Sequence, residues 1–298
     1  MNALLIVNPA AGQGKPDAAL GEIQAVLGPL VGRTYVTHKA GDAESAARGA
    51  AAAGFDAVLV AGGDGTVNEA VNGLLSAPQT LPLGLVPLGT QNVLAAELGQ
   101  SAGDLSAVAA LLRRGRTRGL DVGRLSSGAA SRCFVLMAGF GFDAVVVRDV
   151  LRPVKDLVGP AAYALSTLGT LAKYRSTAIT LTLDGEPIYS EAFWVVIANT
   201  ASYGDKLIKL APFAAPDDGW LDICVFERPR VGRVGFASQM VAVLARRHLR
   251  DPSVRYYRAK TITLSSAPPI SGQLDGEMFG VTPIEITVVP QALSVFVP

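Results

Sequence analysis

The feature that most restricts the fold is an abrupt change of pattern near residue 62. Residues 57–61 are all apolar, which is typical of a strand buried in a parallel sheet. Apolar residues then recur at helical spacing, as Val67, Ala70, Val71 and Leu74. Because the strand pattern gives way to the helical one within a few residues, the sequence predicts a strand–turn–helix unit.

The turn of this unit is rich in glycine and contains one acid: Gly62, Gly63, Asp64 and Gly65. Glycines allow close backbone approaches and leave main-chain N–H groups facing a ligand, and these donors and the helix dipole favour a phosphate. A carboxylate beside phosphates repels them unless a cation lies between or the carboxylate binds something uncharged, and Asp64 therefore points to Mg²⁺ and a nucleotide. An ordinary tight turn is the alternative, which is weakened by the polar residues that follow, Thr66, Asn68 and Glu69.

Residues 1–123 repeat this alternation and predict an α/β N-terminal domain with a Rossmann-like parallel sheet. The expected strands are 3–7, 33–37, 57–61 and 83–86, and the expected helices are 16–28, 42–53, 66–76, 92–98 and 104–115. The glycine-containing loops at 8–15, 62–66 and 89–92 each follow a strand. We therefore expect them to meet at the carboxyl edge of the sheet, where open α/β folds bind ligands.

Residues 124–298 change to β-branched and aromatic runs, which predict a mainly antiparallel β-sandwich. The expected strands are 132–138, 177–183, 188–198, 220–226, 260–265, 283–288 and 292–297. Helical stretches are expected at about 153–174 and 231–248. Two domains also agree with a length of 298 residues, which exceeds the usual range of one core.

Composition gives a few indications of the class of protein. The net charge of +1 indicates no surface for a nucleic acid. Cys133 and Cys224 lie far apart in apolar runs and are expected to be reduced core residues of a cytoplasmic protein. No signal peptide is recognised, and prolines interrupt the uncharged stretch 70–96, so no membrane-spanning segment is predicted.

Gly62–Thr66 followed by Asn68 and Glu69 resembles the nucleotide signature of the diacylglycerol-kinase catalytic family, which includes bacterial YegS-like and DgkB-like lipid kinases. Other segments resemble the family in the same order, namely Asn8–Lys15, Pro87–Asn92, Gly139–Asp143, Ala211–Pro212, Asp217–Asp222 and Asp275–Glu277. The resemblance covers nearly the whole chain.

This resemblance implies a lipid kinase that uses ATP and Mg²⁺ and transfers the γ-phosphate to a lipid hydroxyl, with diacylglycerol as the first candidate. The substrate implies transient association with a membrane surface. The implied nucleotide-binding residues are Asn8, Gly12, Thr37, Gly62, Gly63, Asp64, Gly65, Thr66, Asn68, Glu69, Gly89, Thr90 and Asn92. A kinase with a soluble substrate, such as an NAD kinase, and a catalytically silent nucleotide- or lipid-binding protein remain alternatives. The oligomeric state is open, with a homodimer as one alternative.

The resemblance also assigns Asp275 as the general base, with Glu277 assisting through a metal or through orientation. Asp184–Glu186 has the same three residues between two strand-like runs, and we interpret that copy as a hairpin turn. A turn is the alternative for Asp275 too, but the family order favours catalysis.

A structural Mg²⁺ is a further implication, because YegS-like relatives hold one in the loop corresponding to 215–220. Here its ligands are expected to be Asp218 and the main chain of Ala215 and Trp220, with Asp121 linked through water. Val93 replaces an acid that DgkB-like enzymes use in this network. A solvated turn is the alternative.

The stretch 231–250 combines arginines with apolar residues. We favour a packed helix with a solvated basic end, and the alternative is an interfacial helix that lies on anionic lipid.

Overall fold

The computed structural model describes residues 1–11, 16–88, 92–145, 174–203 and 205–298. Contacts divide the chain into two compact units. Unit 1 comprises Met1–Val122 and Pro290–Pro298, with a short stretch ending at Lys206, and unit 2 comprises Gly123–Tyr203 and Leu207–Val289. The helix expected at 153–174 lies outside the described residues except for its last residue. None of the helices in the described parts is both long and apolar enough to cross a membrane.

Unit 1 is built on a parallel sheet. Its strands are β1 (Ala3–Val7), β2 (Val31–Val36), β3 (Ala57–Gly62) and β4 (Leu83–Pro87), in the spatial order β2-β1-β3-β4. Every residue of β1, β3 and β4 is buried, as expected for parallel strands covered on both faces. The predicted α/β class is confirmed.

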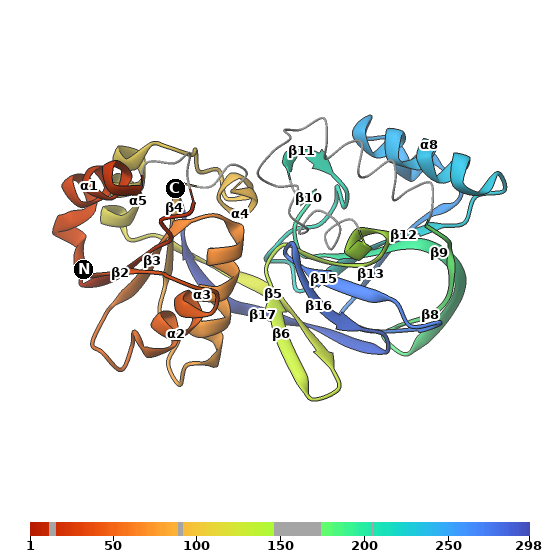
Figure 1. Cartoon of the computed structure of the whole chain (residues 1–298), viewed down its shortest axis with the longest axis horizontal. Helices are drawn as coiled ribbons and strands as arrows, with labels where there is room; N and C mark the ends of the chain where they lie inside the picture. The colour runs from red at the N-terminus through yellow and green to blue at the C-terminus, as the bar shows by residue number, and fades with distance from the viewer. Residues whose placement is uncertain (12–15, 89–91, 146–173, 204) are drawn as a thin grey trace. The chain divides into compact units, whose positions relative to one another are not determined.

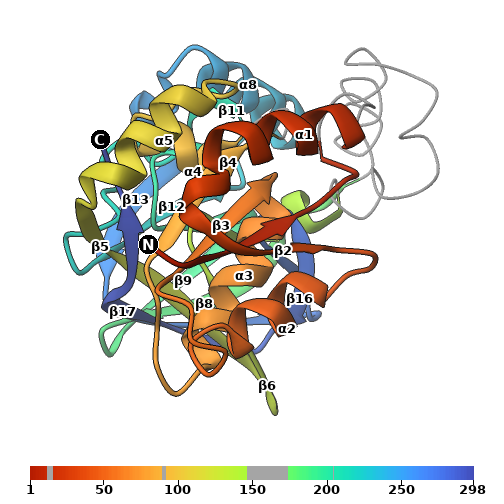
Figure 2. The ribbon, with the colours of Figure 1, turned by 90° about the vertical axis from the view of Figure 1, so that its left-hand side faces the viewer.

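Helices cover both faces of this sheet. They are α1 (Pro16–Leu27), the 3₁₀ turn η1 (Gly28–Leu30), α2 (Asp42–Gly49), α3 (Asp64–Ser76), α4 (Val93–Glu97) and α5 (Leu105–Arg114). Helices α1 and α5 lie on one face, and α2 and α3 lie together on the other (Figures 1 and 2). Helices occupy both faces, and in open α/β sheets of this kind ligands bind at the loops that follow the carboxyl ends of the strands.

Unit 2 contains antiparallel pairs in the order β16-β15-β7-β9-β8-β14-β17, and β12 pairs with β9 and β13. The bounds are β5 (Thr117–Ser127), β6 (Ala130–Phe134), β7 (Met137–Gly141), β8 (Thr177–Leu183), β9 (Glu186–Ala198), β10 (Ser202–Tyr203), β11 (Asp205–Lys209), β12 (Leu221–Glu227), β13 (Val254–Ala259), β14 (Thr261–Ala267), β15 (Ser271–Leu274), β16 (Glu277–Val281) and β17 (Ile284–Phe296). Helix α8 (Gly232–Leu244) and the 3₁₀ turn η2 (His248–Arg250) follow β12.

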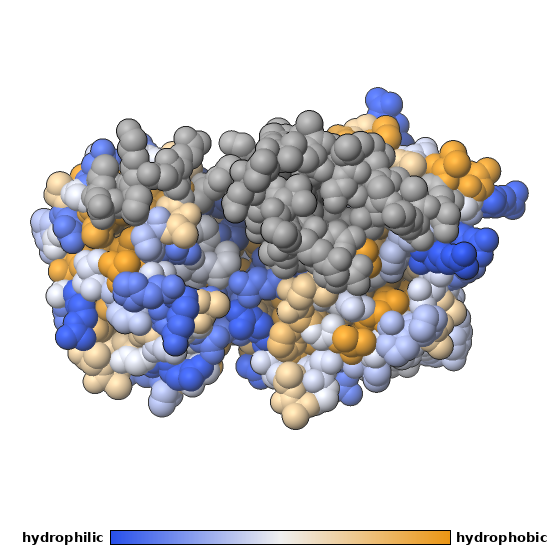
Figure 3. All heavy atoms as spheres, in the orientation of Figure 1, coloured by the Kyte–Doolittle hydropathy of each residue, from blue (hydrophilic) through white to orange (hydrophobic). Residues whose placement is uncertain are grey.

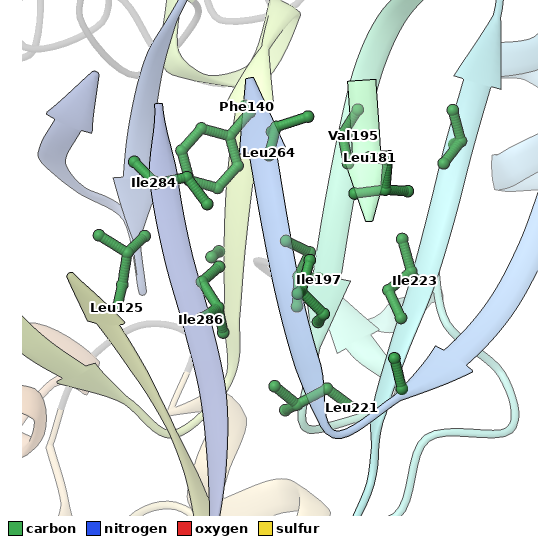
Figure 4. Close-up of a cluster of buried hydrophobic side chains, with 14 of the residues drawn as sticks. Leu125, Phe140, Leu181, Val195, Ile197, Leu221, Ile223, Leu264, Ile284 and Ile286 are labelled. Carbon is green, nitrogen blue, oxygen red and sulfur yellow. The ribbon is translucent and has the colours of Figure 1, made fainter. Parts of the chain in front are cut away.

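The core of unit 2 is formed by the inward-facing side chains of these strands (Figure 4). In β14 the buried and exposed residues alternate, so that Ile262 and Leu264 point inward. Phe140, Ile197 and Ile286 join them and are 0% exposed. Burial of each such side chain contributes about 1.5–3 kcal/mol. The predicted antiparallel sandwich is confirmed.

The end of the chain differs from the prediction. The two strands expected at 283–288 and 292–297 form the single strand β17, which pairs with β14 in unit 2 and ends beside β4 in unit 1. Gln291 has a φ of 48° and lies in the gap 289–291 between the two expected strands. The final residues, Pro290–Pro298, group with unit 1, a return to the first domain that the sequence alone left open.

Gly73 of α3 tests the packing of α3 against α2. A Cβ at this position would lie 2.2 Å from the carbonyl oxygen of Glu44 in α2. We expect Gly73→Ala to lower the free energy of unfolding by about 1–3 kcal/mol, because this overpacking outweighs the helix-forming advantage of alanine. Urea denaturation measures the change.

Gly21 of α1 is the matched control, because a Cβ there has no atom within 4 Å. Gly21→Ala is expected to stabilise the protein by up to about 1 kcal/mol. Equal effects of the two substitutions would contradict the described packing of α2 on α3.

Candidate active site

Asn8 joins two of the loops at the carboxyl edge of the unit 1 sheet. It follows β1, and its Nδ2 donates a hydrogen bond of 2.8 Å to Oγ1 of Thr66 at the start of α3. Its Oδ1 accepts from the main-chain N–H of Ala10 at 3.0 Å. The structure thus brings together two residues that are distant in the sequence and that were both predicted to contact a nucleotide.

The turn between β3 and α3 is shorter than the sequence suggested. Helix α3 begins at Asp64 rather than at residue 66, so that Asp64, Gly65 and Thr66 form its first turn. A Cβ at Gly62 would lie 2.9 Å from Cβ of Thr66, which explains the glycine. Gly63 is the residue before the helix. The first N–H groups of a helix have no partner within it, so this turn is suited to a phosphate.

Asp64 binds the start of the next helix. Its Oδ2 accepts the N–H of Val93 at 3.0 Å, and its Oδ1 accepts that of Leu94 at 3.3 Å. Burial raises the pKa of the Asp64 carboxyl, and these two donors oppose the rise. Sequence reasoning favoured a bound cation as the explanation of this acid and did not identify the contact with α4.

Two other residues predicted to contact the nucleotide, Thr37 and Asn92, lie at this edge of the sheet. Thr37 follows β2 and donates its N–H to the carbonyl of Val7 at 2.9 Å, beside the end of β1. Asn92 is buried before α4, with a φ of 45°, and lines a small pocket with Gly62 and Asp64. These residues lie where a nucleotide is expected.

Asn68 and Glu69 make contacts within the fold. Asn68 is 1% exposed, and its Oδ1 accepts from Nδ2 of Asn72 at 3.1 Å. Oε2 of Glu69 accepts the N–H of Ala43 in α2 at 3.2 Å. Three further predicted nucleotide contacts, Gly12, Gly89 and Thr90, lie outside the described residues.

Asp275 and Gly276 form the turn between β15 and β16. Both residues have a positive φ, of 47° and 89°, as in a two-residue hairpin turn. Asp184 and Gly185 form the same turn between β8 and β9, with φ values of 49° and 95°. The hairpin predicted for the second copy is confirmed, and the first copy has the same backbone.

The two aspartates also resemble each other in their contacts. The Asp275 carboxylate accepts three main-chain N–H groups, those of Val135, Leu136 and Met137, each at 2.9 Å. Asp184 accepts those of Lys260 and Thr261 at 3.0 and 2.8 Å. Each carboxylate therefore fastens its hairpin to a neighbouring segment, and the three donors fix the orientation of Asp275. Beside this turn, Oε2 of Glu277 lies 3.5 Å from Nη2 of Arg132.

Asp143 is connected to this turn and was not assigned a role from the sequence. Nε2 of Gln273 donates to Oδ2 of Asp143 at 2.6 Å, and Oε1 of Gln273 accepts the N–H of Gly276 at 2.7 Å. The hydroxyl of Tyr203 donates to Oδ1 of Asp143. Burial raises the pKa of Asp143 to about 6. Gly139 makes room for this carboxylate, because a Cβ at position 139 would lie 1.9 Å from Oδ2 of Asp143. The glycine is therefore the residue of the sequence that could have indicated the site.

Cationic side chains contact the loop that was expected to hold a structural Mg²⁺. Asp218 accepts the N–H of Trp220 at 3.1 Å and forms an ion pair with Arg258. Arg258 and Lys260 lie 5.6 and 4.7 Å from the centre of the Trp220 ring. Two positive charges at Trp220 do not fit a magnesium ion at this loop.

Two other residues of that expected site lie in different units of the chain. Ala215 lies in the same loop, whereas Asp121 lies in unit 1, fully buried, and accepts the N–H of Gln291 at 2.8 Å. Among the residues that the structure describes, no group of three or more histidine, cysteine or acidic side chains forms a metal site.

Asp143 predicts a dependence of stability on pH. Its pKa is about 6 in the folded protein and 3.8 ordinarily, so between these values the folded state retains a proton that the unfolded state has lost. The free energy of unfolding should therefore fall as the pH rises from about 4 to 6, by about 2–3 kcal/mol relative to the non-titrating variant Asp143→Asn. Urea denaturation across this range measures the difference, and a constant difference would contradict the raised pKa.

Comparison with known proteins identifies the family. Residues 2–125 match the diacylglycerol kinase catalytic domain, and residues 137–297 match the YegS C-terminal NAD kinase beta sandwich-like domain. A diacylglycerol kinase of Staphylococcus saprophyticus is 30% identical over 300 residues, which cover 99% of this chain and 95% of that protein. One of Bacillus subtilis is 31% identical over 265 residues, covering 89% and 85%. A crystal structure assigned as a diacylglycerol kinase of Bacillus anthracis has a TM-score of 0.79 and 26% identity, covering 100% and 97%. The chain therefore belongs to the diacylglycerol-kinase family of lipid kinases.

Proposed function

We propose that this protein transfers the γ-phosphate of ATP to the hydroxyl of a lipid alcohol, with diacylglycerol as the first candidate. The observation that carries the proposal is the glycine turn before α3, where Asn8 and Thr66 join two loops at the carboxyl edge of a parallel sheet. The relatives named diacylglycerol kinase support the choice of lipid.

The nucleotide side of the reaction depends on main-chain donors. The N–H groups of Asp64–Thr66, at the start of α3, would bind phosphate oxygens. Asp64 does not prevent this, because its charge is already shared with the two N–H groups of α4. Each carboxylate oxygen has two lone pairs, so Asp64 has the capacity to keep both bonds and also bind Mg²⁺ or its water. Mg²⁺ bound with ATP would supply neutralisation of the β- and γ-phosphate charges.

The acceptor side depends on Asp275. Its three backbone bonds hold the carboxylate in one orientation, and we assign it to take the proton of the lipid hydroxyl. Such base catalysis typically contributes on the order of a hundredfold or more to the rate. Little other covalent help is required, since the transition state of phosphoryl transfer is loose. Glu277, one residue beyond the turn, is assigned to orientation.

Asp275→Asn separates catalysis from folding, because Asp184→Asn is a matched control with the same turn and the same kind of backbone contact. Both variants lose carboxylate bonds to main-chain N–H groups and should be destabilised by a similar amount, about 1–3 kcal/mol. Only Asp275→Asn should also lower kcat, by about a hundredfold or more, without a comparable change in ATP affinity.

Steady-state kinetics and ATP titration of both folded variants measure these effects. If kcat falls equally in the two variants, or if Asp275→Asn keeps its activity, Asp275 is a turn residue and not the base.

The acceptor itself is tested with γ-labelled ATP, magnesium and a panel of lipid alcohols, with NAD included as a soluble acceptor. We expect label in lipid, and first of all in diacylglycerol. Label in NAD alone would select a soluble-substrate kinase, and ATP binding without transfer would select a silent nucleotide-binding protein.

A further inference from the structure

Helix α8 is anchored to unit 2 by one of its faces. Phe236 is 0% exposed and stacks on Phe193 at 4.6 Å between ring centres. Gln239 is also 0% exposed, and its Nε2 donates to Oγ of Ser253 at 2.9 Å. Val243 is 5% exposed. The expectation of a packed helix is therefore met on this side.

The opposite face of α8 is apolar and exposed. Val231, directly before the helix, is 68% exposed, and Val234, Val241 and Leu244 are 76%, 66% and 67% exposed. At 100° per residue the three helical positions lie within an arc of roughly 80°. These four side chains, which we call the outer face of α8, are four of the ten large exposed hydrophobic side chains in the described residues. Concentration on one element is unlike the usual scatter of single exposed apolar residues.

Positive charge surrounds this face. Residues 228–250 contain six arginines and no aspartate or glutamate, although the whole chain has a net charge of only +1. Arg230 is exposed before the helix, and Arg246, Arg247 and Arg250 are exposed after it. Figure 3 shows apolar and strongly hydrophilic atoms side by side over α8. Because the remainder of the chain is net negative, a negatively charged surface would attract this part of the protein and repel the rest.

We propose that the outer face of α8 docks on the surface of an anionic lipid bilayer. The helix would lie in the plane of the interface, with its valines and leucine among the lipid chains and the arginines on the headgroup phosphates. A bilayer fits better than a protein partner, because protein interfaces are typically centred on aromatic anchors, and this face contains only aliphatic side chains. The inference rests on the proposed function, since a lipid kinase must reach a substrate that lies in a membrane.

The test measures binding of the full chain to vesicles by co-sedimentation, without ATP. The vesicles contain phosphatidylcholine alone or phosphatidylcholine with phosphatidylglycerol. We expect Arg247→Glu/Arg250→Glu to weaken binding to the anionic vesicles by about tenfold or more. Val234→Ser/Val241→Ser should weaken it by about threefold or more without changing the charge.

Arg113→Glu/Arg114→Glu is the matched control. It changes the net charge equally, at two exposed arginines in the last turn of α5, and should leave binding nearly unchanged. Equal loss in the control and in the α8 variants would show that only total charge matters and would overturn the proposal. Unchanged vesicle binding of the α8 variants would also overturn the proposal. If these variants instead alter the sedimentation of the free protein, a second copy of the chain covers this face.

Phosphorylation of a soluble short-chain diacylglycerol separates this inference from the proposed function. We expect the α8 variants to keep this activity while they lose vesicle binding. If the variants phosphorylate the soluble lipid and also bind vesicles normally, the docking proposal is contradicted and the kinase function is not. If the variants lose vesicle binding and no form of the protein phosphorylates the lipid, the kinase function is contradicted and the docking proposal is supported.

Discussion

Main-chain N–H groups hold both carboxylates on which the proposed chemistry depends. Asp64 is bound by the first residues of α4, and Asp275 is bound by three consecutive residues at and before the start of β7. These main-chain donors give each partly buried carboxylate a fixed direction. In unit 1 this permits an acid within a loop that is suited to phosphate. In unit 2 the main-chain N–H groups of the sandwich fix the position of the proposed base.

This arrangement agrees with the demands of phosphoryl transfer, in which positioning and charge neutralisation contribute more than covalent chemistry. The nucleotide side consists of loops that the parallel sheet brings to one edge, with Asn8 tied to Thr66. The acceptor side consists of one hairpin turn, held by the carboxylate of Asp275 itself and by Gln273, which connects the turn to the buried Asp143. Strand β17 belongs to both units, so the two parts share one continuous backbone element.

Much of the fold could be predicted because its elements have strong periodic patterns. Strands β1 and β8 have the expected bounds, since each is a distinct apolar or alternating run. Helix α3 begins earlier than expected because Asp64–Thr66 contribute no apolar face. Strands β13, β15 and β16 were missed, since short or polar strands depend on their neighbours for stability. The bond of Asp64 to α4 and the ion pair of Asp218 with Arg258 connect residues distant in the sequence, so no local pattern indicates them.

The stereochemical course at phosphorus distinguishes direct transfer from transfer through a phosphorylated protein intermediate. ATP with a chiral, isotopically labelled γ-phosphate would be incubated with the protein, magnesium and diacylglycerol, and the configuration of the phosphate in the lipid product would be determined. A single in-line transfer, with Asp275 only removing a proton, predicts inversion of configuration in phosphorylated lipid. Retention would mean a phosphorylated protein intermediate and would contradict the role of Asp275, and the absence of phosphorylated lipid would contradict the function itself.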